Sequence, residues 1–357
     1  MRPPRILVVH PIHLFSTADV YTGLVSGLRA HGCEVSGFNL AYTIREAWFL
    51  VEAAKQAGIP DEFRPDPYAL ASRGLPGAVM ATRAEIVIVI TGAEMHQTAI
   101  EALRTYGVLT AVLCTESPYI KREIADASWY DVVFTNERKA VPLFTHNDPA
   151  QVHYLPHAYN PDVHSPGPAD PNKMCDVCFI GTGFDERRDL IAGVNWRGIH
   201  AVVRGPEWPG TEAAAPVDSC VENAEVADYY RSARITINHH RTTGEHKSGT
   251  MIQPGDAESL GPRAYEIAAC GGFQVMDDSR PAAAEVFGKS LVTYRAGDSA
   301  DLERVIRFYL AHPAERERLA AAQQRAVRAH TWTARATQLL DILQSARVSR
   351  CAASTHA

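Results

Sequence analysis

Two glutamates near the middle of the second half of the chain have a spacing that predicts a ligand site. Glu258 and Glu266 are separated by seven residues, with Gly261 and Pro262 between them. The run RAYEIAACGG has helical spacing, so we expect a loop that ends in a helix, with Glu266 in the early turns. Glu258 would then lie on the loop, near a helix amino terminus that favours anions.

The elements that must position these carboxylates are predicted by alternating patterns along the chain. Short runs rich in valine and isoleucine, such as ILVV at 6–9 and IVIVI at 86–90, are typical of strands buried on both faces of a parallel sheet. Helix-like stretches separate them, which predicts an α/β fold with doubly wound sheets. A polar segment at 160–173, crowded with prolines, divides this series, and strands resume at Cys175. We therefore expect two Rossmann-like domains.

The expected domain limits follow from that division. The first domain covers residues 1–160, a linker covers 161–174, and the second domain covers 175–330. The tail is rich in alanine, arginine and glutamate at helical spacing, and its last helix is expected over 331–347.

Composition and charge restrict the class of protein. The 357 residues include 35 Lys plus Arg and 41 Asp plus Glu, giving a formal net charge of -6. This balance argues against a wholly basic nucleic-acid binder. No apolar run approaches the roughly 20 residues of a membrane span, and prolines and histidines interrupt the amino-terminal apolar stretch. Seven thinly spread cysteines fit reduced thiols, so we expect a cytoplasmic globular protein.

Several segments resemble a known family. The pattern Glu258, seven residues, Glu266, then Ala-Cys-Gly is similar to the donor signature of retaining glycosyltransferases with the two-domain GT-B architecture. CDVCFIGTGFDERR, DYYRSARITIN and YLPHAYNP are similar to segments of the spore-maturation-type (CgeB-like) branch. The resemblance covers most of 108–278. It implies two Rossmann-like domains that face each other across a cleft, with the last helix crossing back to the first domain.

The resemblance also implies roles for residues of the second domain. Glu266 would accept hydrogen bonds from the ribose hydroxyls of a sugar nucleotide, and Glu258, a catalytic candidate, would bind the donor sugar. Gly261 would let backbone N–H groups approach the ligand, and the following helix would point its amino terminus at the diphosphate without a metal. The other expected donor-binding residues are Leu260, Arg263, Arg187 (or Arg188), Lys247, Gly181, Gly183 and Gly205.

Acceptor-side candidates come from the first domain. Ligands of open parallel sheets gather at the carboxyl ends of the strands. His10 and His13 follow the first strand, and Glu116 follows a later one. A partly desolvated carboxylate such as Glu116 can bind or deprotonate an acceptor hydroxyl.

The expected function is transfer of a sugar from a nucleotide diphosphate sugar to a hydroxyl or amine of a small-molecule or glycan acceptor, with retention and without a metal or other cofactor. Three alternatives stay open: a GT-B epimerase or hydrolase of sugar nucleotides, a DNA-base glycosyltransferase, and a non-catalytic nucleotide-sugar-binding protein. GTGFDE has only two of the three glycines of a dinucleotide fingerprint, and Cys175 and Cys178 have no partner pair for zinc. We therefore expect neither NAD nor a structural metal.

Overall fold

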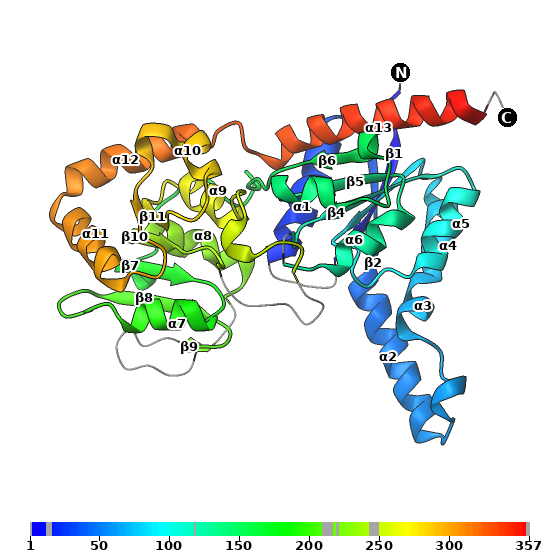
Figure 1. The fold of residues 1–357 in the computed structure, drawn as a ribbon, viewed down its shortest axis with the longest axis horizontal. Coiled ribbons are helices and arrows are strands. Elements are labelled where there is room, and N and C mark those ends of the chain that lie inside the picture. The colour runs from blue at the N-terminus through cyan, green and yellow to red at the C-terminus, as the bar shows by residue number, and fades with distance from the viewer. Residues whose placement is uncertain are drawn as a thin grey trace. The chain divides into compact units, whose positions relative to one another are not determined.

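The computed structural model divides the chain into two compact units. Unit 1 consists mainly of Met1–Leu155 and Thr333–Ala357, and unit 2 mainly of Pro156–His246 and Ile252–Trp332. Each unit contains a six-stranded sheet (Figure 1). The structure describes residues 2–11, 16–117, 119–208, 217–218, 221–242 and 250–354.

The sheet of unit 1 is parallel and has the order β2-β1-β3-β4-β5-β6. Every residue of the IVIVI and LTAVLC runs is buried, as expected for strands covered on both faces. The order reverses between β1 and β3, so the carboxyl end of β1 lies at a switch point where ligands of such sheets bind. The strands are β1 (Arg5–His10), β2 (Glu34–Asn39), β3 (Ile86–Ile90), β4 (Leu109–Cys114), β5 (Val132–Thr135) and β6 (Val152–Tyr154).

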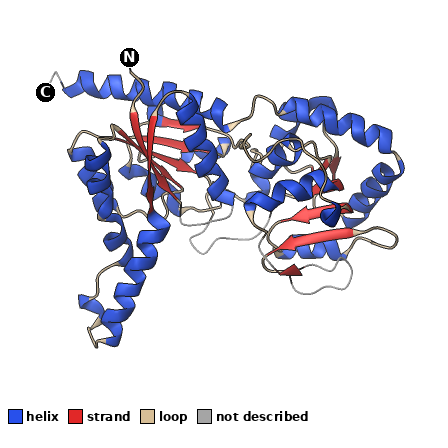
Figure 2. Cartoon of the chain, turned by 180° about the vertical axis from the view of Figure 1, so that it is seen from behind, coloured by secondary structure: helices blue, strands red, loops and turns tan. Residues whose placement is uncertain are grey.

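Helices surround the sheet of unit 1 (Figure 2). Capping side chains mark where some of these helices begin. The Asn39 side chain accepts a hydrogen bond from the backbone N–H of Tyr42, and Asp66 caps a helix that begins with Pro67. The last helix belongs to unit 1, which confirms the predicted return of the chain to the first domain. The helices are α1 (Ser16–Ala30), α2 (Leu40–Gln56), α3 (Pro67–Ser72), α4 (Gly74–Thr82), α5 (Gln97–Thr105), α6 (Arg122–Asp126) and α13 (Trp332–Ser354).

The sheet of unit 2 is also parallel and has the order β12-β11-β10-β7-β8-β9. The chain runs outward from β7 through β8 and β9, then returns to place β10 on the other side of β7. The switch point of unit 2 therefore lies at the neighbouring carboxyl ends of β7 and β10. The strands are β7 (Cys175–Ile180), β8 (Ala201–Gly205), β9 (Val217–Asp218), β10 (Ala233–Asn238), β11 (Gln274–Asp277) and β12 (Thr293–Tyr294).

The segment expected to be a linker, 161–174, is counted in unit 2. Arg231 donates through Nε to the carbonyl of Ser165 at 2.8 Å, and the backbone N–H of Asp170 donates to the hydroxyl of Ser232 at 2.9 Å. These bonds attach the segment to α8. The helices of unit 2 are α7 (Asp185–Ala192), α8 (Asn223–Ser232), α9 (Pro262–Ala269), α10 (Ala282–Phe287), α11 (Ser299–Ala311) and α12 (Pro313–Ala326).

Among the described helices, none combines the length and the apolar character that a membrane crossing requires.

Candidate functional site

The carboxyl ends of β7 and β8 approach each other closely in unit 2, and glycines make the approach feasible. The N–H of Gly181 donates to the carbonyl of Arg204 at 2.9 Å, and the indole N–H of Trp208 donates to the carbonyl of Gly181 at 2.8 Å. Gly205 has a φ of +141°, and a Cβ there would overlap the carbonyl group of Gly181. A Cβ on Gly183 would lie 2.6 Å from the carbonyl oxygen of Glu207, so this turn also requires a bare backbone.

Two arginines converge on the same turn. The Cζ atoms of Arg187 and Arg263 lie 5.5 Å and 5.4 Å from the centroid of the Phe179 ring. A Cβ placed on Gly181 would lie 3.5 Å from Nη1 of Arg187 and 2.5 Å from Nη2 of Arg263. Arg187 is buried at the start of α7. Two guanidinium groups beside a bare backbone form a good seat for phosphate oxygens, which arginine binds through paired hydrogen bonds.

The alternative arginine, Arg188, has other partners. Its side chain donates to the carbonyls of Gly183 and Glu207 and pairs with Asp185. It therefore braces the turn after β7. Arg187 also braces this turn, since it donates to the carbonyl of Thr182 at 3.0 Å, but its guanidinium in addition lies against Gly181. Lys247 lies outside the described residues.

Helix α9 begins at Pro262, one residue before Arg263, and this start agrees with the predicted loop that ends in a helix. Gly261 is its N-cap, makes no side-chain cap, and is followed by Pro262 in the first turn. A Cβ on Gly261 would meet no described atom within 4 Å, so space is open at this helix end. Leu260 differs, because its side chain is buried in the apolar cluster formed with α9 and α10. Any contact of Leu260 with a polar ligand is therefore limited to its backbone.

Glu266 lies on α9, and Glu258 lies on the loop before it; both side chains are partly exposed. Burial raises the pKa of Glu266 to about 7, against the opposing effect of the Arg263 charge. A carboxylate oxygen of Glu266 lies within 4.8 Å of a ring nitrogen of His164. The carbonyl of Glu258 accepts the N–H of Ala282 at 3.2 Å, which ties its loop to the start of α10.

A buried group of histidines and an aspartate, which were not among the predicted site residues, lies at the ends of β10, β11 and β12. Asp277 is fully buried and accepts hydrogen bonds from the backbone N–H of His240 at 2.6 Å and from its Nδ1 at 2.9 Å. The Nδ1 of His239 lies 2.9 Å from the hydroxyl of Tyr294. Burial lowers the pKa of His239 to about 4. Side chains at adjacent strand ends are far apart in the sequence, so only the sheet order reveals this group.

In unit 1, His10 ends β1 at the switch point. Its ring packs edge-on against Tyr21, with 4.6 Å between ring centroids, and its Nδ1 lies 2.6 Å from the carbonyl oxygen of Pro11. His13 lies outside the described residues.

Glu116 follows β4 and adjoins a second carboxylate that sequence reasoning missed. Its backbone N–H lies 3.4 Å from Oε1 of Glu123, and the hydroxyl of Ser117 donates to Oε2 of Glu123 at 2.8 Å. Burial raises the pKa of Glu123 to about 8, and that of Glu94, after β3, to about 7. The strand-end rule applied to β3 would have identified Glu94. Glu123 could not be identified in this way, because only the folded path of the loop after β4 brings it beside Glu116.

The raised pKa of Glu123 predicts a pH-dependent stability. A carboxyl whose folded pKa is about 8 binds its proton more tightly than in the unfolded chain, so its contribution is complete below the unfolded value near 4.5 and disappears as the pH rises through 8. We expect the free energy of unfolding to fall between pH 5.5 and 8.5 by about 3 kcal/mol more in the parent protein than in Glu123→Gln. Urea denaturation at both pH values measures this difference. Equal losses in the two proteins would exclude a neutral, buried Glu123.

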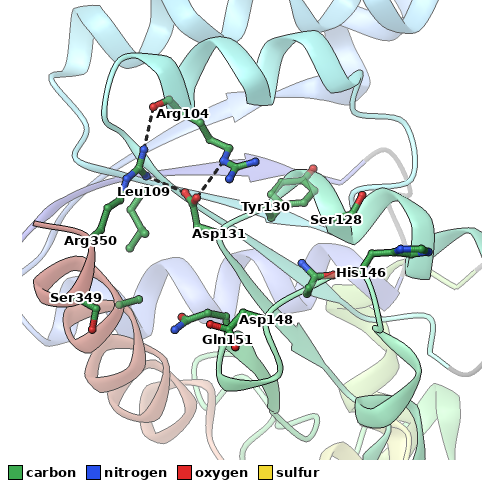
Figure 3. A pocket seen from close by; sticks show the side chains of 12 residues that line it. Arg104, Leu109, Ser128, Tyr130, Asp131, His146, Asp148, Gln151, Ser349 and Arg350 are labelled. Atoms are coloured by element: carbon green, nitrogen blue, oxygen red, sulfur yellow. Dashed lines mark hydrogen bonds and ion pairs between the residues drawn. The ribbon is translucent and has the colours of Figure 1, made fainter. Parts of the chain in front are cut away.

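A polar cavity in unit 1 lies away from the predicted site residues. It encloses about 460 Å³ between loops that precede β5 and β6 and the end of α13 (Figure 3). Asp131 accepts from Arg104 at 3.0 Å and from Arg350 at 2.9 Å. Arg350 also donates to the carbonyl of Val108 at 3.0 Å, so its bonds hold α13 against the amino ends of β4 and β5, opposite the edge that carries His10 and Glu116.

Comparisons with known proteins agree with this architecture. Residues 187–341 match a family described as glycosyl transferase-like. The chain is 24% identical to the spore protein CgeB of Bacillus subtilis over 253 residues, which cover 68% of this chain and 78% of that protein. The comparisons support a GT-B-type glycosyltransferase.

Solved glycosyltransferase structures share the fold of this GT-B-type chain. A sucrose-phosphate synthase from Thermosynechococcus elongatus has a TM-score of 0.64 at 14% identity, covering 97% of this chain and 100% of that one. A glycosyltransferase from Rickettsia africae has a TM-score of 0.66 at 10% identity, with 97% and 99% covered. HepE of Anabaena, solved with UDP and glucose, has a TM-score of 0.61 at 12% identity, with 96% and 100% covered.

Proposed function

We propose that the protein transfers a sugar from a nucleotide diphosphate sugar to an acceptor hydroxyl or amine, with retention and without a metal. The observation that carries the proposal is the convergence of Arg187 and Arg263 on Gly181, beside the open amino terminus of α9. Guanidinium groups, bare backbone and a helix amino terminus together favour a diphosphate. The glycosyl transferase-like match includes both arginines.

Each donor residue has a task in this proposal. The two arginines stabilise the charge that develops on the leaving diphosphate. The bare backbone at Gly181, Gly183 and Gly205 lets the ends of β7 and β8 approach closely, which sets the position of the turn on which the two arginines converge. Departure of the diphosphate generates an oxocarbenium-like centre, so the reaction depends more on positioning and charge stabilisation than on a strong base.

The two glutamates bind the rest of the donor. Glu266, in its ionised form, accepts hydrogen bonds from the ribose hydroxyls. Because burial raises its pKa to about 7, donor binding stabilises a carboxylate that is only partly ionised at neutral pH. Glu258 binds hydroxyls of the donor sugar from its loop.

We assign acceptor binding to the carboxyl edge of the sheet in unit 1. His10 is the last residue of β1 and Glu116 follows β4, both at this edge, and both are partly exposed. Glu116 would orient or deprotonate the attacking hydroxyl.

Nucleoside diphosphate binding provides the first test. At a concentration 100 times its Kd, a ligand that binds only the folded state stabilises it by about 2.7 kcal/mol. We therefore expect one of UDP, GDP, ADP and dTDP to raise the Tm by about 5 °C or more. Absence of a shift with every diphosphate at millimolar concentration would contradict the proposal.

Product analysis then separates the activities that share a donor site. The protein is incubated with the matching nucleotide sugar, with and without a panel of sugar and amine acceptors. We expect a glycosylated acceptor whose anomeric configuration equals that of the donor. Release of free sugar would indicate a hydrolase, a changed sugar nucleotide an epimerase, and binding without any turnover a binding protein.

A further inference from the structure

His240 carries a buried ring nitrogen that no described residue satisfies. Its side chain is buried after β10, and Nε2 has no hydrogen-bond partner among the residues that the structure describes. A buried polar atom without a partner costs free energy, on the order of 1–3 kcal/mol. Such an atom requires a partner from outside the described residues, and a bound ligand can supply it.

The partner of the other ring nitrogen defines the chemistry of Nε2. The Nδ1 atom lies 2.9 Å from Oδ2 of Asp277, and this oxygen also accepts the backbone N–H of His240. The other carboxylate oxygen, Oδ1, accepts the backbone N–H of Ser279 at 3.1 Å. Burial alone would raise the pKa of Asp277, but His240 holds it below its usual range. An ionised carboxylate only accepts, so Nδ1 carries a hydrogen, and in the neutral ring Nε2 then presents a lone pair.

A lone pair on Nε2 can pair only with those parts of a nucleotide sugar that donate a hydrogen bond. Diphosphate oxygens are themselves acceptors and cannot pair with it. A sugar hydroxyl can donate to it. Burial lowers the pKa of the His240 ring, which opposes conversion of Nε2 into a donor.

The surroundings of His240 connect it to both ends of the donor site. Strand β10 pairs with β7, and Arg187 donates through Nη2 to the carbonyl of His239 at 2.9 Å. The loop that follows Asp277 leads to Ala282, whose N–H donates to the carbonyl of Glu258 at 3.2 Å. His240 thus belongs to a hydrogen-bond network that links Arg187 to the loop of Glu258.

We propose that Nε2 of His240 accepts a hydrogen bond from a hydroxyl of the donor sugar, and that Asp277 positions the ring for this contact. The inference rests on the proposed function and deepens it, because it adds a residue that distinguishes nucleotide sugar from nucleoside diphosphate.

The test compares UDP-glucose with UDP by isothermal titration calorimetry, or GDP-mannose with GDP if the parent protein binds that pair instead. In His240→Asn the amide can still donate to Asp277, but nothing replaces the Nε2 lone pair. We expect about tenfold weaker binding of the nucleotide sugar and less than twofold change for the diphosphate. His200→Asn, at an exposed position of unit 2, is the matched control and should change neither affinity.

His240→Gln keeps the test decisive if His240→Asn does not fold, as judged by its thermal transition. The longer amide reaches the position of Nε2 and can accept the hydroxyl, so nucleotide sugar binding should return towards the parent value. Unchanged binding of both ligands, or an equal loss for both, would overturn the role of His240. A parent protein that binds none of UDP, GDP, ADP and dTDP would instead contradict the proposed function.

Discussion

Replacement of Glu266 by alanine is expected to lower kcat/KM for sugar transfer about 30- to 1000-fold, a loss of roughly 2–4 kcal/mol in transition-state stabilisation. The carboxylate accepts two ribose hydroxyls in the proposed complex, and charge-assisted hydrogen bonds are the stronger kind. The donor KM should rise and kcat should fall, because ribose binding also orients the reacting diphosphate.

The pH dependence distinguishes this role from a merely structural one. Burial raises the pKa of Glu266 to about 7, so kcat/KM of the parent enzyme should rise with pH through that value as the carboxylate ionises. The alanine variant should lack this limb. Glu317→Ala, at an exposed position on α12, is the control and should behave as the parent. Transfer kinetics unaltered by Glu266→Ala would refute the ribose assignment.

The sequence was sufficient to predict the fold because its pattern is local. Runs such as IVIVI at 86–90 are buried over their whole length in the structure, as parallel strands covered on both faces must be. The helix after Gly261 was predictable because a Gly-Pro pair followed by helical spacing is a start signal. The order of the strands in each sheet was beyond such patterns, since it depends on which distant runs pair.

The site was predictable only where one segment carries it. Glu258 and Glu266 lie on one loop and helix, so their spacing was visible. The pairing of His240 with Asp277 was not, because 36 residues separate them and only the neighbouring of β10 and β11 brings them together. For Leu260, the sequence led to a prediction that its side chain does not fit. Its position next to Gly261 predicted a donor-binding residue, but its apolar side chain is buried in the core.

Replacement of Gly205 by alanine is expected to destabilise unit 2 by about 2–4 kcal/mol and to abolish nucleotide binding. Two effects combine at this residue. Its φ of +141° strains any residue with a Cβ, and that Cβ would overlap the carbonyl group of Gly181. To relieve the overlap, the ends of β7 and β8 must separate, which moves the turn on which Arg187 and Arg263 converge.

Gly198→Ala separates backbone strain from overlap. Gly198 also has a positive φ, +78°, but a Cβ there would meet no described atom within 4 Å. It should therefore cost only about 1 kcal/mol and leave diphosphate affinity unchanged. Urea denaturation and calorimetry of the two variants measure both quantities. If the two substitutions cost the same and both bind diphosphate as the parent does, the close approach of β7 and β8 is not what shapes the phosphate seat. A larger loss confined to Gly205→Ala would show that the donor site depends on backbone contact between two strand ends, which no side-chain substitution in the site can probe.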